Sequence, residues 1–257
     1  MLFSALVDAD RLDTESHGTL SKTELRARHA AEPLEMTRLF ERVQAEMDAK
    51  AALDASNPQS INALRRQMYA SALSHSADEP GFFRLTMPTG GGKTLTSLAF
   101  ALQHAHQHRL RRVIYAVPFT TIIDQTAKDF RRVLEQPGEF KVLEHHSNLE
   151  VKEKKVGEEN QTTASDLATE NWDAPVIVTT TVRLFQETLF GTRTSQLRRL
   201  HNMTGSVIVL DEVQSLPAHL LEPTLDALQF LVKYAQCSIV LCTATQPALN
   251  EELGFPP

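Results

Sequence analysis

The residues with the clearest chemical potential form a glycine-rich segment, Met87-Pro88-Thr89-Gly90-Gly91-Gly92-Lys93-Thr94. Consecutive glycines let the backbone curl so that its N–H groups point inward, and such groups bind phosphate oxygens. A helix that begins at Lys93 would add the positive end of its dipole. We therefore predict that Thr89, Gly90, Gly91, Gly92, Lys93 and Thr94 bind ATP. The Lys93 ammonium would contact the terminal phosphates and the Thr94 hydroxyl a magnesium ion. The alternative is a glycine turn with an incidental lysine.

A second candidate is the acidic pair Asp211-Glu212, which follows the apolar run Ser206–Leu210. Two adjacent carboxylates at a strand end can divide the work of hydrolysis, because one holds a metal ion while the other orients and deprotonates the attacking water. We assign magnesium to Asp211 and the base to Glu212, and include Lys93 and Gln214 among the catalytic candidates. The alternative is that the acids only cap the next helix.

A third apolar run, Ser238–Cys242, ends in Thr243-Ala244-Thr245. Short hydroxyl side chains at this strand end can hydrogen-bond the acidic motif, so Thr243 and Thr245 are candidates for coupling nucleotide state to another site. The alternative is a loop of small residues without such a role.

The elements that would position these motifs alternate between short β-branched runs and amphipathic helices. This alternation predicts an α/β fold with a mostly parallel sheet covered by helices on both faces, and ligands bind at the carboxyl ends of such strands. The expected strands are Phe82–Thr86, Val113–Val117, Phe140–His145, Val176–Thr180, Val207–Leu210 and Ser238–Cys242. The expected helices between them include Lys93–His108, Thr121–Leu134 and His219–Tyr234.

An all-helical segment is predicted before this core. Apolar residues at helical spacing predict one long helix from Leu20 to about Ala52, and a second helix after the break at Asn57-Pro58. We divide the chain into residues 1–56 and residues 57–257. Residues 150–171 are polar, and we predict that they form a mobile insertion on the surface.

Composition limits the possible functions. The chain has 257 residues and a formal net charge of −6, so any nucleic-acid contact must be local rather than the effect of a general positive field. The spacing between Cys237 and Cys242 is not that of a metal-binding pair, and we predict that both are reduced thiols in the core. The absence of a signal peptide or a membrane-length apolar run predicts a soluble cytoplasmic protein without a membrane partner. We predict that His104, His106 and His108 are solvated residues at the end of a helix.

The three motifs in this order resemble those of superfamily-two helicases of the DExH type. Met87 replaces the first glycine of the general phosphate-loop pattern, and Pro-Thr-Gly-x-Gly-Lys-Thr is the form that many helicases use. Asp-Glu-Val-Gln, the run Val117–Gln125 and Leu143-Glu144-His145-His146-Ser147 are similar to the CRISPR-associated helicase-nucleases of type I systems. The resemblance implies the first RecA-like lobe of an ATP-dependent, magnesium-dependent DNA helicase that translocates on single-stranded DNA in antiviral defence.

The resemblance also implies further site residues and partners. Pro118, Phe119, Thr120, Thr179, Thr180 and Thr181 would line the path of single-stranded DNA; the alternative is that the threonines are ordinary strand-end and capping residues. Gln67 is a candidate adenine contact, although an exposed helical glutamine is the plainer interpretation. In a complete protein, a guide-RNA surveillance complex would be the partner.

In this family an HD-type metal nuclease domain precedes the helicase, and residues 6–15 resemble its last helix. Asp10 matches the final metal ligand, but its partner ligands should lie before Met1, so we expect a vestigial site without a divalent metal; the alternative is that Asp10 is a solvated acid in an acidic segment. Residues 1–56 would then be a remnant of that domain with its linker. Because the sequence ends at Pro257, we expect the second lobe needed for efficient turnover to be missing. The competing hypotheses are an inert nucleotide-binding remnant or half of a split protein, and a P-loop ATPase unrelated to nucleic acid.

Overall fold

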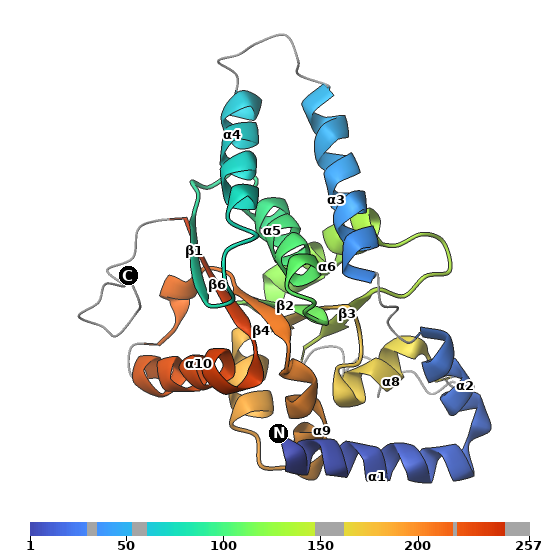
Figure 1. Cartoon of the computed structure of the whole chain (residues 1–257). Helices are drawn as coiled ribbons and strands as arrows, with labels where there is room; N and C mark the ends of the chain where they lie inside the picture. Colours follow the sequence, from blue (N-terminus) through green and yellow to red (C-terminus); the bar gives the residue numbers. More distant parts are fainter. Residues whose placement is uncertain (30–34, 53–60, 147–161, 218–219, 245–257) are drawn as a thin grey trace.

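The structure, a computed structural model of the chain, describes residues 1–29, 35–52, 61–146, 162–217 and 220–244 (Figure 1). Its centre is a sheet whose described strands are all parallel, in the order β1-β6-β5-β2-β4-β3. These strands are β1 (Phe82–Thr86), β2 (Arg112–Val117), β3 (Val142–His145), β4 (Val176–Thr180), β5 (Ser206–Leu210) and β6 (Ser238–Thr243). The predicted α/β class and parallel sheet are confirmed, and β3 begins two residues later than expected.

The central strands are mostly apolar because both faces of the sheet are covered. Successive side chains of a strand point to opposite faces, and this alternation separates valines from isoleucines and leucines. Val113 and Val176, for example, belong to one buried cluster, whereas Ile114 and Ile177 belong to the other.

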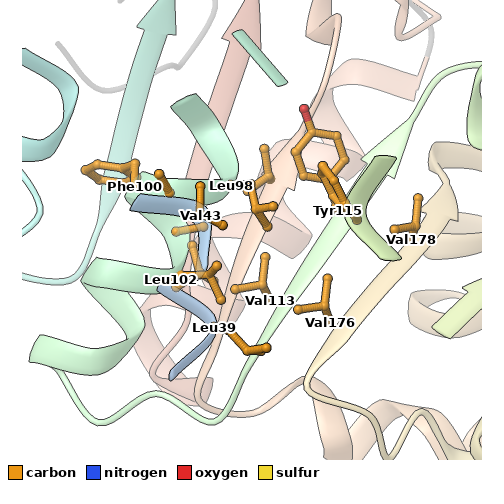
Figure 2. Close-up of a cluster of buried hydrophobic side chains, with 14 of the residues drawn as sticks. Leu39, Val43, Leu98, Phe100, Leu102, Val113, Tyr115, Val176 and Val178 are labelled. Carbon is orange, nitrogen blue, oxygen red and sulfur yellow. The ribbon is translucent and has the colours of Figure 1, made fainter. Parts of the chain in front are cut away.

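One face packs against α3 (Glu35–Ala52), α4 (Ile61–Ser74), α5 (Lys93–Gln107) and α6 (Thr120–Leu134). Figure 2 shows this cluster, in which Leu39 and Val43 of α3 and Leu98 and Leu102 of α5 lie beside Val113 of β2, with Val176 and Val178 of β4 beyond it. Leu39 and Val43 have no exposed surface. Helix α3 is therefore part of the core of the sheet domain.

This packing crosses the predicted division at residues 56 and 57. Helix α3 lies on the N-terminal side of that division in the sequence, yet it packs on α5 and α6. The long helix expected from Leu20 to Ala52 is wrong, because two helices, α2 (Leu20–His29) and α3, occupy the described residues of this range.

The other face is covered by α8 (Ala164–Asn171), the π-helix η1 (Arg183–Leu189) and α10 (Leu221–Ala235). Trp172, which follows α8, is completely buried there. The short helices α9 (Thr194–Leu200), η2 (His201–Met203) and η3 (Val213–Ser215) complete the described elements of this half. Helix α1 (Leu2–Gly18) lies along α9 (Figure 1).

Helix α8 corrects the predicted insertion at residues 150–171. Residues 150–161 lie outside the described part of the chain, but Ala164–Asn171 forms a helix that begins with a capping box between Thr163 and Asp166. Leu167 and Ala168 are buried. The polar composition of this helix concealed a short apolar face.

Three further expectations can be compared with the structure. Cys237 and Cys242 are buried free thiols, as predicted. His104 is completely buried between the Ser76 carbonyl and the Ser238 hydroxyl, both 2.8 Å away, so the prediction of a solvated histidine is wrong for this residue. Among the described helices, none combines the length and the apolar character that crossing a bilayer requires.

Candidate nucleotide-binding site

The three motifs meet at one edge of the sheet. Because the strands are parallel, the residues after β1, β5 and β6 all emerge on the same side. The Met87 N–H donates to the Thr243 carbonyl over 3.1 Å, which ties the start of the glycine-rich loop to the end of β6. Thr243 is buried, and Thr245 lies outside the described residues.

The glycines of the loop meet different backbone demands. Gly90 and Gly92 have φ angles of +77° and +87°, which side chains disfavour, and the space around each is open. At Gly91 a Cβ atom would lie only 2.8 Å from the Pro88 carbonyl oxygen, which accepts a hydrogen bond from the Gly91 N–H. Thr89 precedes this turn, and Gly92 is the N-cap of α5. The loop therefore offers an uncrowded helix N-terminus.

Lys93 lies between the two carboxylates of the acidic motif. Its Nζ atom is 3.0 Å from Asp211 Oδ1 and also contacts Glu212 Oε1. Burial acts to lower the pKa of Lys93, but these ion pairs outweigh it and the pKa is raised. The structure thus brings the phosphate-loop lysine and both predicted catalytic acids into direct contact.

Glu212 has a left-handed backbone conformation, with φ 47° and ψ 51°. A residue other than glycine adopts it at a cost of about 1 kcal/mol, so other contacts must stabilise it. Gln214 Nε2 donates to Glu212 Oε2 over 2.5 Å, and the Ala244 N–H also donates to this carboxylate. Burial acts to raise the pKa of Glu212, but Lys93, Gln214 and the Ala244 N–H together lower it. Ala244 therefore links the third motif to the acidic motif.

A buried tyrosine of the sheet contacts the helix that follows the glycine-rich loop. Tyr115 of β2 is completely buried, and its hydroxyl lies 3.1 Å from the Ser97 hydroxyl in the first turns of α5. Burial, with the nearby Asp211 charge, raises the pKa of Tyr115 well above its usual value. The buried hydroxyl therefore ties β2 to the start of α5, which begins with Lys93 and Thr94.

Sequence reasoning missed Arg65 of α4. Its Nε and Nη2 atoms donate to the Gly90 carbonyl over 2.9 and 2.6 Å, while Nη1 donates to Asn62 Oδ1 over 2.7 Å. Arg65 also lines a cavity of about 260 Å³ beside Gly90 to Gly92. Gln67 is exposed and does not line this cavity, which agrees with the plainer interpretation of that residue. Arg65 and Gly90 are 25 residues apart in the sequence, so no local sequence pattern indicates their contact.

The predicted DNA contacts divide into two groups. Phe119 is 58% exposed where α6 begins, next to the half-buried Pro118 and Thr120. Thr179, Thr180 and Thr181 are buried. The Thr179 hydroxyl donates to the His145 carbonyl over 2.9 Å, and the Thr180 hydroxyl accepts from the Arg183 N–H. The hydroxyls of Thr179 and Thr180 thus have structural partners, as in the capping alternative.

Asp10 is exposed on α1, whereas Asp8, two residues earlier, is buried. Asp8 pairs with Arg198 of α9 over 2.7 Å and accepts from Asn171 over 3.0 Å. Among the described residues, Asp10 belongs to no group of three or more metal-ligating side chains.

Comparisons with known proteins identify the family. A family model described as DEAD/DEAH box helicase matches residues 62–253. The CRISPR-associated nuclease/helicase Cas3 of Haloferax volcanii is 30% identical over 196 residues, which cover 70% of this chain and 21% of that protein. The chain thus spans about a fifth of the length of this relative.

Solved structures agree on the fold. T. fusca Cas3 with ADP superimposes with a TM-score of 0.56 and 20% identity, covering 73% of this chain and 21% of that one. T. fusca Cas3 with ATP gives a TM-score of 0.56 and 23% identity, covering 77% and 22%. The RecA-like fold and the resemblance predicted from the motifs are confirmed. The chain belongs to the DEAD/DEAH box helicase family.

Proposed function

We propose that this chain is the ATP-binding lobe of a DNA helicase that translocates along single-stranded DNA in CRISPR antiviral defence. The similarity to Cas3 supports this role, and in the whole protein a guide-RNA surveillance complex would be the partner. Membership of the helicase family makes a P-loop ATPase unrelated to nucleic acid the weaker alternative.

The observation that carries the proposal is the contact of Lys93 with Asp211 and Glu212 at the mouth of the glycine-rich loop. These residues come from segments more than 100 positions apart. An ammonium group, a flexible glycine loop and two carboxylates at strand ends are the parts that nucleoside triphosphate hydrolysis requires.

The residues also fit a magnesium ion. The two carboxylates and the ammonium together carry an excess negative charge, and oxygen ligands suit a hard dication. Thr94 and Asp211 would hold the ion, which when bound would neutralise charge on the phosphates. The space at Gly90 and Gly92 leaves room for phosphate oxygens.

Each remaining residue has a defined task in this proposal. The Lys93 ammonium exchanges its carboxylate contacts for the terminal phosphates. Glu212, held by Gln214 and the Ala244 N–H, orients a water molecule and accepts its proton. The Glu212 N–H donates a hydrogen bond to Asp211 Oδ1 over 3.0 Å, which fixes the two acids relative to each other.

The exposed group at the start of α6 supports contact with single-stranded DNA. Phe119 offers an aromatic face on which a base can stack without sequence preference. Pro118 and Thr120 flank it, while the buried Thr179 and Thr180 hold the neighbouring strand end in place.

Titration of the chain with MgATP in a calorimeter tests the nucleotide site. Lys93→Ala should weaken binding by about 10- to 100-fold, because hydrogen bonds to charged groups contribute about 1.5–3 kcal/mol. Lys233→Ala on α10, whose ammonium lies 5.1 Å from the centre of the Tyr234 ring, is the control and should bind as the unaltered chain does. Equal affinity of Lys93→Ala and the unaltered chain would overturn the proposal, and so would failure of the unaltered chain to bind MgATP.

A further inference from the structure

A cluster of metal-ligating side chains lies away from the nucleotide site, where α6 packs beside the end of β3. The carboxylates of Asp124 and Glu144 and the imidazole of His146 each place one ligand atom within 4.8 Å of the others. His146 Nε2 is 3.0 Å from Glu144 Oε1 and 3.4 Å from Asp124 Oδ1.

The fold explains why these residues meet. Val142 and Glu144 point to the face of the sheet that α6 covers, since they are two residues apart in β3. Asp124 and Arg131 are seven residues apart in α6 and so lie on one side of that helix. Arg131 donates to Glu144 Oε2 over 2.8 Å and leaves Oε1 to face His146.

These separations suit a coordinated cation. Metal–ligand bonds of about 2.1 Å place neighbouring ligand atoms roughly 3.0 Å apart in an octahedron and roughly 3.4 Å apart in a tetrahedron. One imidazole and two carboxylates favour a first-row transition-metal dication over calcium or magnesium.

Burial gives a second, independent indication. His146 is 2% exposed, and its described polar contacts are the two carboxylates, while its Nδ1 atom has no partner among the described residues. The preceding His145 is already engaged, because Trp172 Nε1 donates to its Nδ1 over 2.8 Å. Asp124 is half-exposed and gives the cluster access to solvent, so a cation could enter and keep water ligands.

We propose that Asp124, Glu144 and His146 bind a first-row transition-metal dication of the zinc type. The ion joins the first half of α6 to the end of β3. It thereby fixes α6, which the exposed Phe119 directly precedes, against the sheet. This proposed metal site does not depend on whether the chain binds a nucleotide.

Cobalt(II) titration, followed by visible absorption, tests the proposal. Excess magnesium occupies the carboxylates of the nucleotide site, so that the signal reports the nitrogen-containing cluster. The unaltered chain should bind one cobalt ion per chain. His146→Gln and Asp124→Asn should each weaken binding by at least about 100-fold, since even the loss of an outer partner of a ligand weakens metal sites 10- to 100-fold.

His75→Gln is the matched control, because His75 forms an exposed pair with Asp78 at 2.9 Å. It should bind cobalt as tightly as the unaltered chain. Circular dichroism shows whether each variant is folded, and the half-exposed Asp124 keeps one ligand variant free of core disruption. Absence of binding in magnesium excess, undiminished binding by Asp124→Asn, or equal loss in His75→Gln would overturn the proposal.

Discussion

The ion pairs of Lys93 define what nucleotide binding must change at the residue scale. The Lys93 side chain is 11% exposed and its ammonium contacts Asp211 and Glu212, so a phosphate that binds it would compete with these carboxylates. Glu212 would then depend on Gln214 and the Ala244 N–H for its position. Loss of the lysine contact would therefore free the proposed base to meet a water molecule while the third motif still holds it.

A second ion pair, between Arg42 and Glu139, allows a test by pH. Hydrogen bonds from Arg42 lower the pKa of Glu139 to about 2. Burial acts in the opposite direction, and a hydrogen bond from the Gln136 N–H lowers the pKa further. A depressed carboxylate pKa contributes stability that is present above the unfolded value of 4.5 and is lost as the pH falls through 2. Glu139→Gln should lower the free energy of unfolding by about 1 kcal/mol at pH 7, because the pair is partly exposed.

Urea unfolding between pH 7 and pH 3 measures this difference. It should shrink steadily below pH 4.5. Glu41→Gln, an exposed carboxylate of the same helix α3 as Arg42, is the control and should change stability by less than about 0.5 kcal/mol. A deficit for Glu139→Gln that stays constant across this range would show that the charge of the pair is not its cause.

Local motifs made part of the site predictable from the sequence. Lys93, Asp211 and Glu212 stand out because each follows an apolar run in a recognised spacing, and the structure brings them together. Arg65 could not be found in this way, since its contact with Gly90 depends on how α4 packs. The burial of Thr179 depends on the packing of β3 beside β4, which local spacing does not reveal.

At the scale of elements, the buried strands were the easiest to predict. Their apolar residues cover both faces, so that each run begins and ends within about two residues of its prediction. Helix α8 was missed because only a short face, including Leu167, is buried. The periodicity that marks α3 as a helix could not say which surface it covers.

A core substitution in α3 tests whether this helix belongs to the sheet domain. Leu39 is completely buried against α5 and β2. Leu39→Ala should lower the free energy of unfolding of the whole domain by about 2–5 kcal/mol, the usual range for a leucine cavity. Thermal or urea unfolding, followed by the circular dichroism of the sheet domain, measures the change.

Leu20→Ala provides the comparison, because Leu20 is 73% exposed on α2. Its effect should stay within about 0.5 kcal/mol. If Leu39→Ala left the main transition unchanged and only added a small early one, α3 would be a separate unit, as the division after residue 56 predicts.

At the scale of the whole molecule, charged residues join the N-terminal helices to the far end of the fold. Arg198 of α9 contacts Asp8 of α1 over 2.7 Å and Glu170 of α8 over 2.9 Å. Arg26 of α2 contacts the same Glu170 over 2.6 Å, and Glu15 of α1 over 2.8 Å. These pairs link α1 and α2 to α8 and α9, an arrangement that composition and periodicity could not reveal. Helices α1 and α2 are thus held in a fixed orientation against α8 and α9.

Removing Asp8 should release α1 without unfolding the sheet. Its carboxylate is 4% exposed, and its loss would leave Arg198 largely buried without this partner, which costs about 3 kcal/mol in comparable pairs. Hydrogen–deuterium exchange of the α1 amides should therefore become about 10- to 100-fold faster in Asp8→Ala, while the β2 and β5 amides keep their protection. Asp10→Ala, which removes an exposed carboxylate from the same helix, should leave exchange nearly unchanged. If both variants exchanged alike, apolar packing on α9 rather than the Asp8–Arg198 pair would hold α1. Faster exchange in the strands as well would show that α1 and the sheet unfold together as one cooperative unit.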